Sequence, residues 1–162
     1  MSLRRRVNAP ALLCALAAAA ALTAAGCGGG GDDTSSKDRY ITSADGICNE
    51  ARQVSTAMQQ QIQQVMGQGN VVGAAQVINQ YQPEYRRHLD RLAALAPPKG
   101  DESQVKAVVA AMNESADDVA AESRALAGND QALFDQVAAS SRTHQARAQK
   151  LAKAYGYKVC GG

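Results

Sequence analysis

Helical periodicity is the feature that most restricts the fold of this chain. From about Ser43 to Tyr155, apolar residues recur every three or four positions, and no stretch alternates between apolar and polar residues as a half-buried strand does. The first periodic segment, from about Ser43 to Met66, carries one apolar stripe: Ile47, Ala51, Val54, Met58, Ile62 and Val65. This spacing predicts an amphipathic helix that buries the stripe.

Three more periodic segments follow, separated by turn residues. The second begins after Asn70 and ends before Pro97, the third follows Asp101, and the fourth ends at Gly156. Four helices of about 25 residues, joined by short turns, predict an all-α, up-down-up-down four-helix bundle over residues 42–162. In the fourth helix the buried stripe would consist of Phe134, Val137, Ser141, Ala148, Leu151 and Tyr155.

Two helix ends carry specific signals. Asp101 followed three residues later by Gln104 is the arrangement of a capping box, in which the first side chain accepts a hydrogen bond from a backbone N–H of the first turn. Gly156 at the end of the last helix is typical of a left-handed C-terminal stop.

Pro83 lies in the middle of the second periodic segment. A proline inside a helix removes one backbone donor and crowds the preceding turn, at a cost of about 3 kcal/mol. Because the apolar stripe stays in phase across Pro83, we expect a kinked helix, with two abutting helices as the alternative. Tyr81 and Tyr85 flank the break and are candidates for lining a ligand cavity or for packing in the core.

The first 26 residues have the organisation of a targeting segment. Arg4, Arg5 and Arg6 precede an apolar run over residues 11–22, which is too short to cross a bilayer because a spanning helix needs about 20 residues. Small residues then lead to a cysteine. This pattern predicts a secretory signal over residues 1–26, which takes no part in the fold.

The end of that segment resembles a bacterial lipoprotein signal, in which small residues precede an obligatory cysteine. The resemblance implies cleavage between Gly26 and Cys27 and a diacylglycerol thioether on Cys27, and two acyl chains give stable membrane anchoring. Residues 27–41 would then form a lipidated, flexible linker, because the stretch GGGGDDTSSKDR at 28–39 cannot bury itself. An ordinary secretory signal that contains a cysteine is the alternative.

The charge balance gives no reason to expect a nucleic-acid partner. Removal of residues 1–26 takes away three arginines and no acid, which leaves 14 basic residues against the 15 acidic residues of the chain. A nearly neutral domain lacks the basic surface that attracts phosphate backbones. It also lacks a polybasic route to a membrane surface, so the predicted membrane contact is the lipid anchor.

Four cysteines are present, and two of them remain for the folded domain. Cys14 lies in the signal and Cys27 is the predicted anchor, whereas Cys48 lies early in the first helix and Cys160 follows the last helix. These two helix ends meet at one pole of an up-down-up-down bundle, so we predict a Cys48–Cys160 disulfide. Closing so long a loop stabilises the fold by about 4–5 kcal/mol. A pair of thiols serving metal or redox chemistry is the alternative.

Short motifs around these positions resemble a group of small alanine-rich lipoproteins of actinobacteria, largely of unknown function. The matching stretches are ADGIC at 44–48, LAALAPP at 92–98 and YGYKVC at 155–160, which fit an ADxIC, LaaLxPP and yGxxxC pattern. The resemblance implies a helical, disulfide-closed, membrane-tethered domain. It brings no catalytic residues.

The sequence holds no recognisable catalytic motif. A nucleophile elbow, a P-loop, a dinucleotide-binding glycine pattern and a haem attachment motif are all absent from it. Ser140 and Ser141 precede His144, but no third group is evident, and His88 stands among three arginines on an expected solvated face. We therefore predict no enzyme activity, no cofactor and no metal site, with a His88–His144 metal pair as the alternative.

Two functional hypotheses remain. The first is a non-catalytic lipoprotein at the extracytoplasmic face of the cell membrane, which presents its helices to a partner protein of the envelope. The second is a lipoprotein that binds a small molecule or lipid in a cavity near Pro83, with Tyr81 and Tyr85 in its lining.

Overall fold

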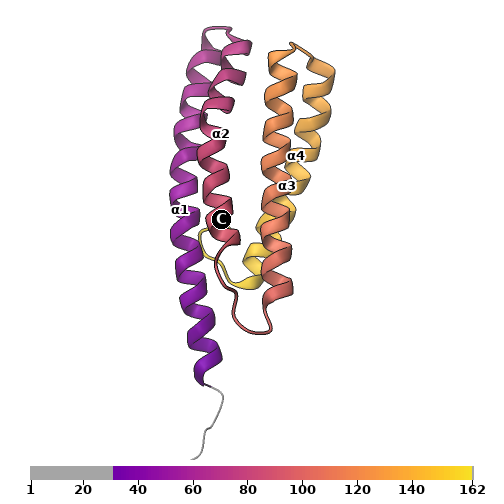
Figure 1. Ribbon diagram of the computed structural model, residues 1–162. Helices are drawn as coiled ribbons and strands as arrows, with labels where there is room; N and C mark the ends of the chain where they lie inside the picture. Colours follow the sequence, from indigo (N-terminus) through magenta and orange to yellow (C-terminus); the bar gives the residue numbers. More distant parts are fainter. Residues whose placement is uncertain (1–30, 162) are drawn as a thin grey trace, which may run out of the picture.

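The structure, a computed structural model, describes residues 31–161. Four helices follow one another along the chain: α1 (Gly31–Gly67), α2 (Val71–Ala93), α3 (Glu102–Ala127) and α4 (Gln131–Tyr155). Figure 1 shows two helical hairpins, α1–α2 and α3–α4, that stand side by side, with the start of α1 projecting beyond the other helices. The described residues contain no strand, and the predicted all-α, up-down-up-down fold is confirmed.

The turns end the helices as the sequence predicts. Gly69 after α1 and Gly156 after α4 have φ values of 72° and 113°, in the left-handed region that glycine adopts without strain. The N–H of Gly156 donates to the Lys153 carbonyl, and the N–H of Tyr157 donates to the Ala152 carbonyl, each over 3.1 Å. These are the two bonds of a Schellman motif, which stops α4 and sets the direction of the C-terminal tail.

Asn70 caps α2, whereas the capping box predicted at Asp101 is wrong. The Asn70 side chain accepts a hydrogen bond from Gly73 N at 2.8 Å and caps α2. The Asp101 side chain makes no cap hydrogen bond to α3. Its carboxylate instead accepts from the Tyr155 hydroxyl at 2.8 Å and pairs with Lys37 at 3.5 Å, so tertiary partners compete successfully with the local cap.

α1 starts at Gly31, twelve residues before the predicted start at Ser43. The linker predicted over 27–41 is therefore helical from Gly31 onward, because part of it has packing partners that its polar composition does not reveal. Tyr40 is only 6% exposed and packs against two tyrosines of the chain's C-terminal region. The predicted signal at 1–26 and the predicted lipid site at Cys27 lie outside the described residues.

α2 runs without interruption through Pro83. The helix extends from Val71 to Ala93 as one element, so the alternative of two abutting helices is wrong. Pro83 lies on the exposed side of α2, where the carbonyl that it leaves without a helical partner can bind water.

The hydrophobic core is concentrated at one end of the molecule, which we call the closed pole and which contains the turn at 94–101 and the tail at 156–161. Tyrosines and alanines dominate this core cluster, which consists of Tyr40, Ala44, Ile47, Leu89, Leu92, Val105, Val108, Ala111, Met112, Ala116, Ala148, Ala152, Tyr155 and Tyr157. At the other end, the open pole, the turns at 67–71 and 127–131 close the two hairpins. Few residues of α4 are buried, and they all lie toward its C-terminal end: Ala148, Ala152 and Tyr155.

The predicted disulfide is present at the closed pole. Cys48 in α1 and Cys160 in the tail are bonded, with their Cα atoms 5.2 Å apart. The bond connects the first helix to the chain that leaves the last helix. The first and the last helix of the domain are therefore linked covalently.

A carboxylate beside the disulfide holds the same tail. Asp45 accepts hydrogen bonds from three successive backbone N–H groups, those of Lys158 at 3.0 Å, Val159 at 2.8 Å and Cys160 at 3.2 Å. Three consecutive amides that converge on one anion form a concave binding site made of backbone alone. The Arg52 guanidinium also donates to the Val159 carbonyl at 2.8 Å. The ADGIC and YGYKVC stretches thus form one joint between α1 and the tail.

Candidate binding cleft between α1 and α4

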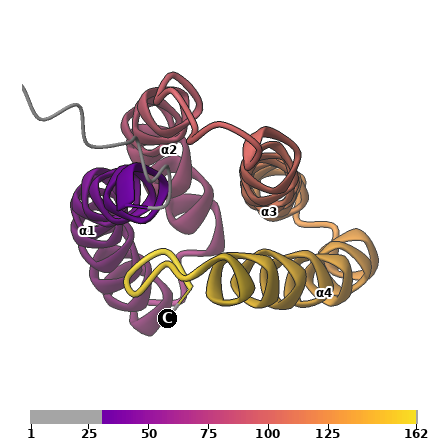
Figure 2. The ribbon, with the colours of Figure 1, turned by 90° about the horizontal axis from the view of Figure 1, so that it is seen from below.

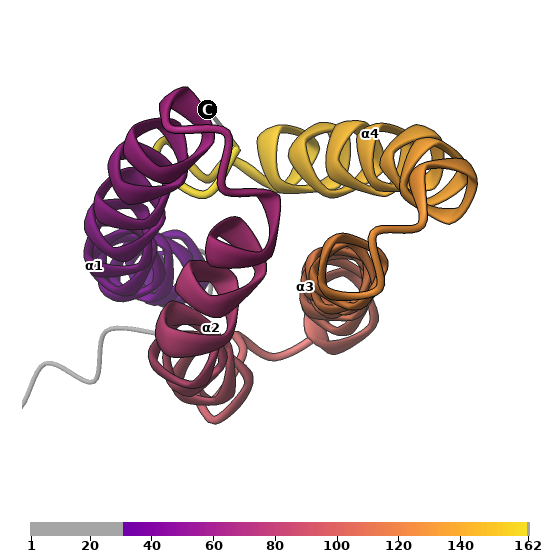
Figure 3. The same cartoon turned by 90° about the horizontal axis from the view of Figure 1, so that it is seen from above.

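The bundle is open along one side. Each helix packs against its neighbours in sequence, but in the described part of the chain no Cα atom of α1 lies within 8 Å of a Cα atom of α4. Figures 2 and 3, views from below and from above, show that α4 slants along one side of the bundle, from a start beside α3, and approaches α1 only through its C-terminal end and the tail. We call the space that remains the α1–α4 cleft.

Two cavities occupy this cleft. The first has a volume of about 340 Å³ and reaches the Cys48–Cys160 disulfide, whereas the second has a volume of about 420 Å³ and lies nearer the open pole. Both cavities share five lining residues: Ser55, Gln59, Tyr85, Ser115 and Gln145. The two cavities are therefore parts of one continuous cleft. The volume of each cavity lies within the range of about 300–1,000 Å³ that is usual for ligand sites.

The floor of the cleft is apolar. Met58 and Ile62 of α1, Ile78 of α2 and Val119 of α3 line the second cavity. These residues belong to the stripes that a closed bundle would bury against a fourth helix. Because α4 slants away, they face a cavity instead, and Met58, Ile62 and Val119 remain only half-buried.

Uncharged polar side chains surround this floor. Gln59, Ser115, Ser141 and Gln145 line the second cavity, and none of them has a hydrogen-bond partner among the described residues. Tyr85 lies between the two cavities, and burial raises the pKa of its phenol, which stays neutral near pH 7. These groups reach water and have no protein partner, so they are available to a ligand, and an apolar surface bordered by a few such groups is the usual chemistry of a small-molecule site.

Each cavity has one charged side chain in its lining. Arg52 lines the first cavity and is held by the Val159 carbonyl. Glu122 of α3 lines the second cavity and is half-buried. Within residues 31–161, Glu122 has neither an ion pair nor a hydrogen bond through its side chain.

The structure brings only one of the three predicted cavity residues to the cleft. Tyr85 lines both cavities, but neither Tyr81 nor Pro83 lines either of them. The Tyr81 hydroxyl accepts a hydrogen bond from the Gln61 amide at 2.7 Å, which ties α2 to α1. These two cavities therefore lie beside Tyr85, where α4 slants away from α1, and not at Pro83.

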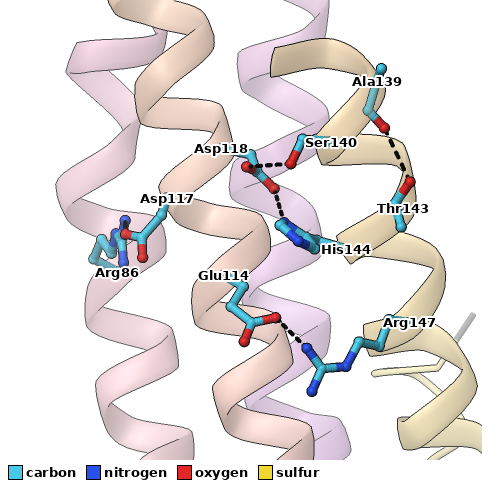
Figure 4. Close-up of polar contacts among 9 residues, drawn as sticks. All are labelled: Arg86, Glu114, Asp117, Asp118, Ala139, Ser140, Thr143, His144 and Arg147. Atoms are coloured by element: carbon cyan, nitrogen blue, oxygen red, sulfur yellow. Dashed lines mark hydrogen bonds and ion pairs between the residues drawn. The ribbon is translucent and has the colours of Figure 1, made fainter. Parts of the chain in front are cut away.

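Ser140 and His144 of α4 are not arranged as a nucleophile and its general base. Figure 4 shows that His144 and Ser140 both contact Asp118 of α3, His144 through Nδ1 at 2.7 Å and Ser140 through its hydroxyl at 3.4 Å. The carboxylate thus lies between the hydroxyl and the imidazole. General-base activation requires the imidazole to accept the serine proton, and this arrangement does not provide that contact.

Ion pairs flank this contact and join the helices. Figure 4 shows Arg86 of α2 paired with Asp117, and Arg147 of α4 donating to Glu114 of α3, the latter over 2.6 Å. All of these side chains connect neighbouring helices. Their arrangement supports a structural role for this polar network.

His88 does not lie on a solvated face, contrary to expectation. It is 8% exposed, and its Nδ1 lies 3.5 Å from Glu50 Oε2 and 3.3 Å from an Arg91 nitrogen. His88 thus joins α2 to α1, whereas His144 joins α4 to α3. Among the described residues, no group of three or more histidine, cysteine, aspartate or glutamate side chains is placed to hold a metal ion.

The fold and the cleft define a disulfide-closed, four-helix domain with one open side. No protein-family model, curated protein or solved structure matches this chain. Within residues 31–161 no helix has the length and apolar character needed to cross a bilayer.

Proposed function

We propose that this chain is a lipoprotein anchored at the extracytoplasmic face of the cell membrane, and that it acts by binding a small molecule in the α1–α4 cleft. The observation that carries the binding proposal is the combination of an apolar floor with unpartnered polar side chains around Tyr85. The cavity volumes of about 340 and 420 Å³ suit a ligand of the size of a small metabolite or drug.

The anchor is tested by labelling growing bacteria that express the full chain with an alkyne analogue of palmitate. We expect label on the protein and none on a Cys27→Ser variant, because Cys27 is the predicted acceptor. A Cys14→Ser variant is the matched control and keeps the label. Equal labelling of the wild type and Cys27→Ser would refute the anchor.

Binding is tested with N-phenyl-1-naphthylamine, an uncharged dye that fluoresces in apolar sites. Ser115 lines both cavities, so Ser115→Phe fills the cleft and should weaken dye binding at least about tenfold. Ser103→Phe places the same ring on an exposed position of α3 and should leave binding unchanged. If a folded Ser115→Phe protein binds the dye as the wild type does, the cleft is not the site.

A second candidate function is docking of an envelope protein at the open pole. Among the residues whose exposure the structure describes, three large apolar side chains are exposed, Met66 at 44%, Val72 at 49% and Leu133 at 41%, and all lie next to the turns of that pole. Their position at the tips of both hairpins suits contact with a partner. A photo-cross-linking residue at Val72, compared with one at exposed Lys99 on the closed pole, tests this candidate in cells. Cross-links from Val72 alone would support it, and none from either position would refute it.

A further inference from the structure

Glu122 is an exception among the carboxylates of this protein. Five carboxylate residues in the described part of the chain are half-buried, and four of them have partners: Asp45, Asp101, Glu114 and Asp118. Glu122, the fifth, has no partner among the described residues.

No side-chain oxygen of the described residues is both fully buried and without a partner, so the Glu122 carboxylate reaches the solvent of the cavity. The other half-buried carboxylates are already engaged by backbone N–H groups, a hydroxyl, a histidine or an arginine. Glu122 alone among them is therefore free to pair with a ligand. A bound cation would supply the missing partner to Glu122.

The surroundings of Glu122 restrict what that cation can be. No lysine, arginine or histidine lines the second cavity, so its only formal charge is negative. Beside it lies the apolar floor of Met58, Ile62, Ile78 and Val119. A bare metal ion would gain nothing from this floor, and a single carboxylate is a poor ligand set for one. An organic cation with an apolar body would use both features.

We propose that the second cavity binds a monocationic amphiphile, whose ammonium group pairs with Glu122 and whose apolar body covers the floor of the cleft. This proposal deepens, and rests on, the proposed binding function of the α1–α4 cleft. The uncharged polar groups at Ser141 and Gln145 can accept the remaining ammonium protons. The cavity volume of about 420 Å³ accommodates a chain of about ten carbons.

The test compares three ligands of equal length and different charge: decylammonium, decanol and decanoate. The chain from Cys27 onward, with Cys27→Ser to prevent lipidation, contains the whole described fold and is titrated at pH 7 by calorimetry below the aggregation concentrations of the ligands. We expect decylammonium to bind at least about tenfold more tightly than decanol, and decanoate to bind more weakly than decanol. The preference for decylammonium should shrink as salt is added.

Glu122→Gln keeps the shape of the side chain and removes its charge. We expect this variant to bind decylammonium no more tightly than decanol, with the affinity for decanol unchanged. Glu84→Gln, on an exposed position of α2 outside the cleft, is the matched control and should retain the wild-type preference. Since no partner is lost, Glu122→Gln should fold with an unchanged or higher midpoint of thermal unfolding.

The outcomes separate this proposal from the one on which it rests. Equal affinity of the wild type for decylammonium and decanol overturns the cation site and leaves the cleft as a binding site. Retention of the decylammonium preference by Glu122→Gln overturns the role of Glu122. Failure of all three amphiphiles and of the uncharged dye to bind overturns both proposals.

Discussion

The carboxylate of Asp45 accepts a hydrogen bond from the backbone of Val159, a residue 114 positions later in the chain. The Val159 N–H donates to Oδ1 of Asp45 at 2.8 Å, and the amides on either side donate to the same carboxylate. This contact and the neighbouring disulfide are the means by which the end of the chain meets α1. The joint matters because, among the described residues, α1 touches α4 only near its C-terminal end, where Tyr40 meets Tyr155, and no Cα atoms of the two helices come within 8 Å.

Asp45→Ala should destabilise the fold by about 2–3 kcal/mol. The substitution leaves three amides of the tail without their anionic acceptor, and hydrogen bonds to charged groups contribute about 1.5–3 kcal/mol each where water cannot replace them. Chemical denaturation measures the loss, and hydrogen exchange should be faster at Lys158, Val159 and Cys160. Asp38→Ala, an exposed position on α1, is the control and should change little. Equal stability of both variants would contradict a role for Asp45 as an anchor of the tail.

Replacement of Cys48 and Cys160 by serine should cost about 4–5 kcal/mol of unfolding free energy. The bond spans a sequence separation of 112 residues, and a crosslink over so long a loop strongly restricts the unfolded chain. The midpoint of urea unfolding measures the effect, and reduction of the wild type should lower it by the same amount. A midpoint that is unaffected by either treatment would show that the joint at Asp45 closes the bundle without the disulfide.

Alkaline pH should unfold this protein through its tyrosines. Burial raises the pKa of Tyr155 and of Tyr157 above the ordinary value, and hydrogen bonds to Asp101 and to Tyr40 respectively raise it further. The folded state therefore keeps phenolic protons that the unfolded state loses above about pH 10. Stability is fully present below that pH and falls as the pH rises further.

Tyr157→Phe tests this alkaline transition. In the wild type the Tyr157 hydroxyl is buried and donates to the Tyr40 hydroxyl at 3.1 Å. The substitution therefore removes one hydrogen bond at pH 7, and it also removes one phenol whose pKa is raised by folding. We expect urea unfolding curves of the variant to depend less steeply on pH above about 10 than those of the wild type. Identical slopes for the two proteins would refute the assignment.

Asp117 and Asp118 are adjacent in α3 but should differ in their contributions to stability. The Asp118 side chain is 14% exposed and contacts His144, whereas the Asp117 side chain is 71% exposed and pairs with Arg86 at the surface. Asp118→Asn should cost about 1–3 kcal/mol, and Asp117→Asn less than about 1 kcal/mol. Thermal unfolding of the two variants compares them under one set of conditions. The reverse order would mean that the buried contact carries no net stabilisation.

The periodicity of apolar residues and the positions of the cysteines predict much of this fold. Both can be read from short stretches of sequence, and together they determine the helices, their inward faces and the covalent link between the first and the last helix. An apolar stripe such as that from Ile47 to Val65 fixes which side of a helix faces inward, and the turn at Gly156 fixes where α4 ends. The pairing of Cys48 with Cys160 then follows from the antiparallel order of four helices.

The α1–α4 cleft could not be predicted in the same way. A stripe indicates that a face is apolar, but not that another helix covers it. Phe134 and Val137 at the start of α4 are only half-buried, because this part of the helix lies away from α1. The polar residue Ser141 within the α4 stripe is only a weak signal, because Ser123 of α3 is equally polar and yet is fully buried, with its hydroxyl donating to the Ala75 carbonyl.

The functions of Asp45 and Asp101 also depend on tertiary structure. Asp45 follows the predicted start of the first helix at Ser43, and Asp101 precedes the third helix, so local rules predict that each interacts with a helix N-terminus; each instead finds partners far away in the chain. Sequence rules identify hydrogen-bond partners that are near in the chain. They do not show that the amides of the tail or a tyrosine hydroxyl will lie closer once the chain has folded.

The disulfide also determines what a single proteolytic cut can do to this fold. All three turns between the helices lie inside the covalent loop from Cys48 to Cys160. A protease that cuts any one of these turns opens the loop but releases no fragment, since both pieces stay joined through the sulfur atoms. A nicked molecule would remain a single covalent unit with its four helices still packed, and only a second cut or a reductant could take it apart.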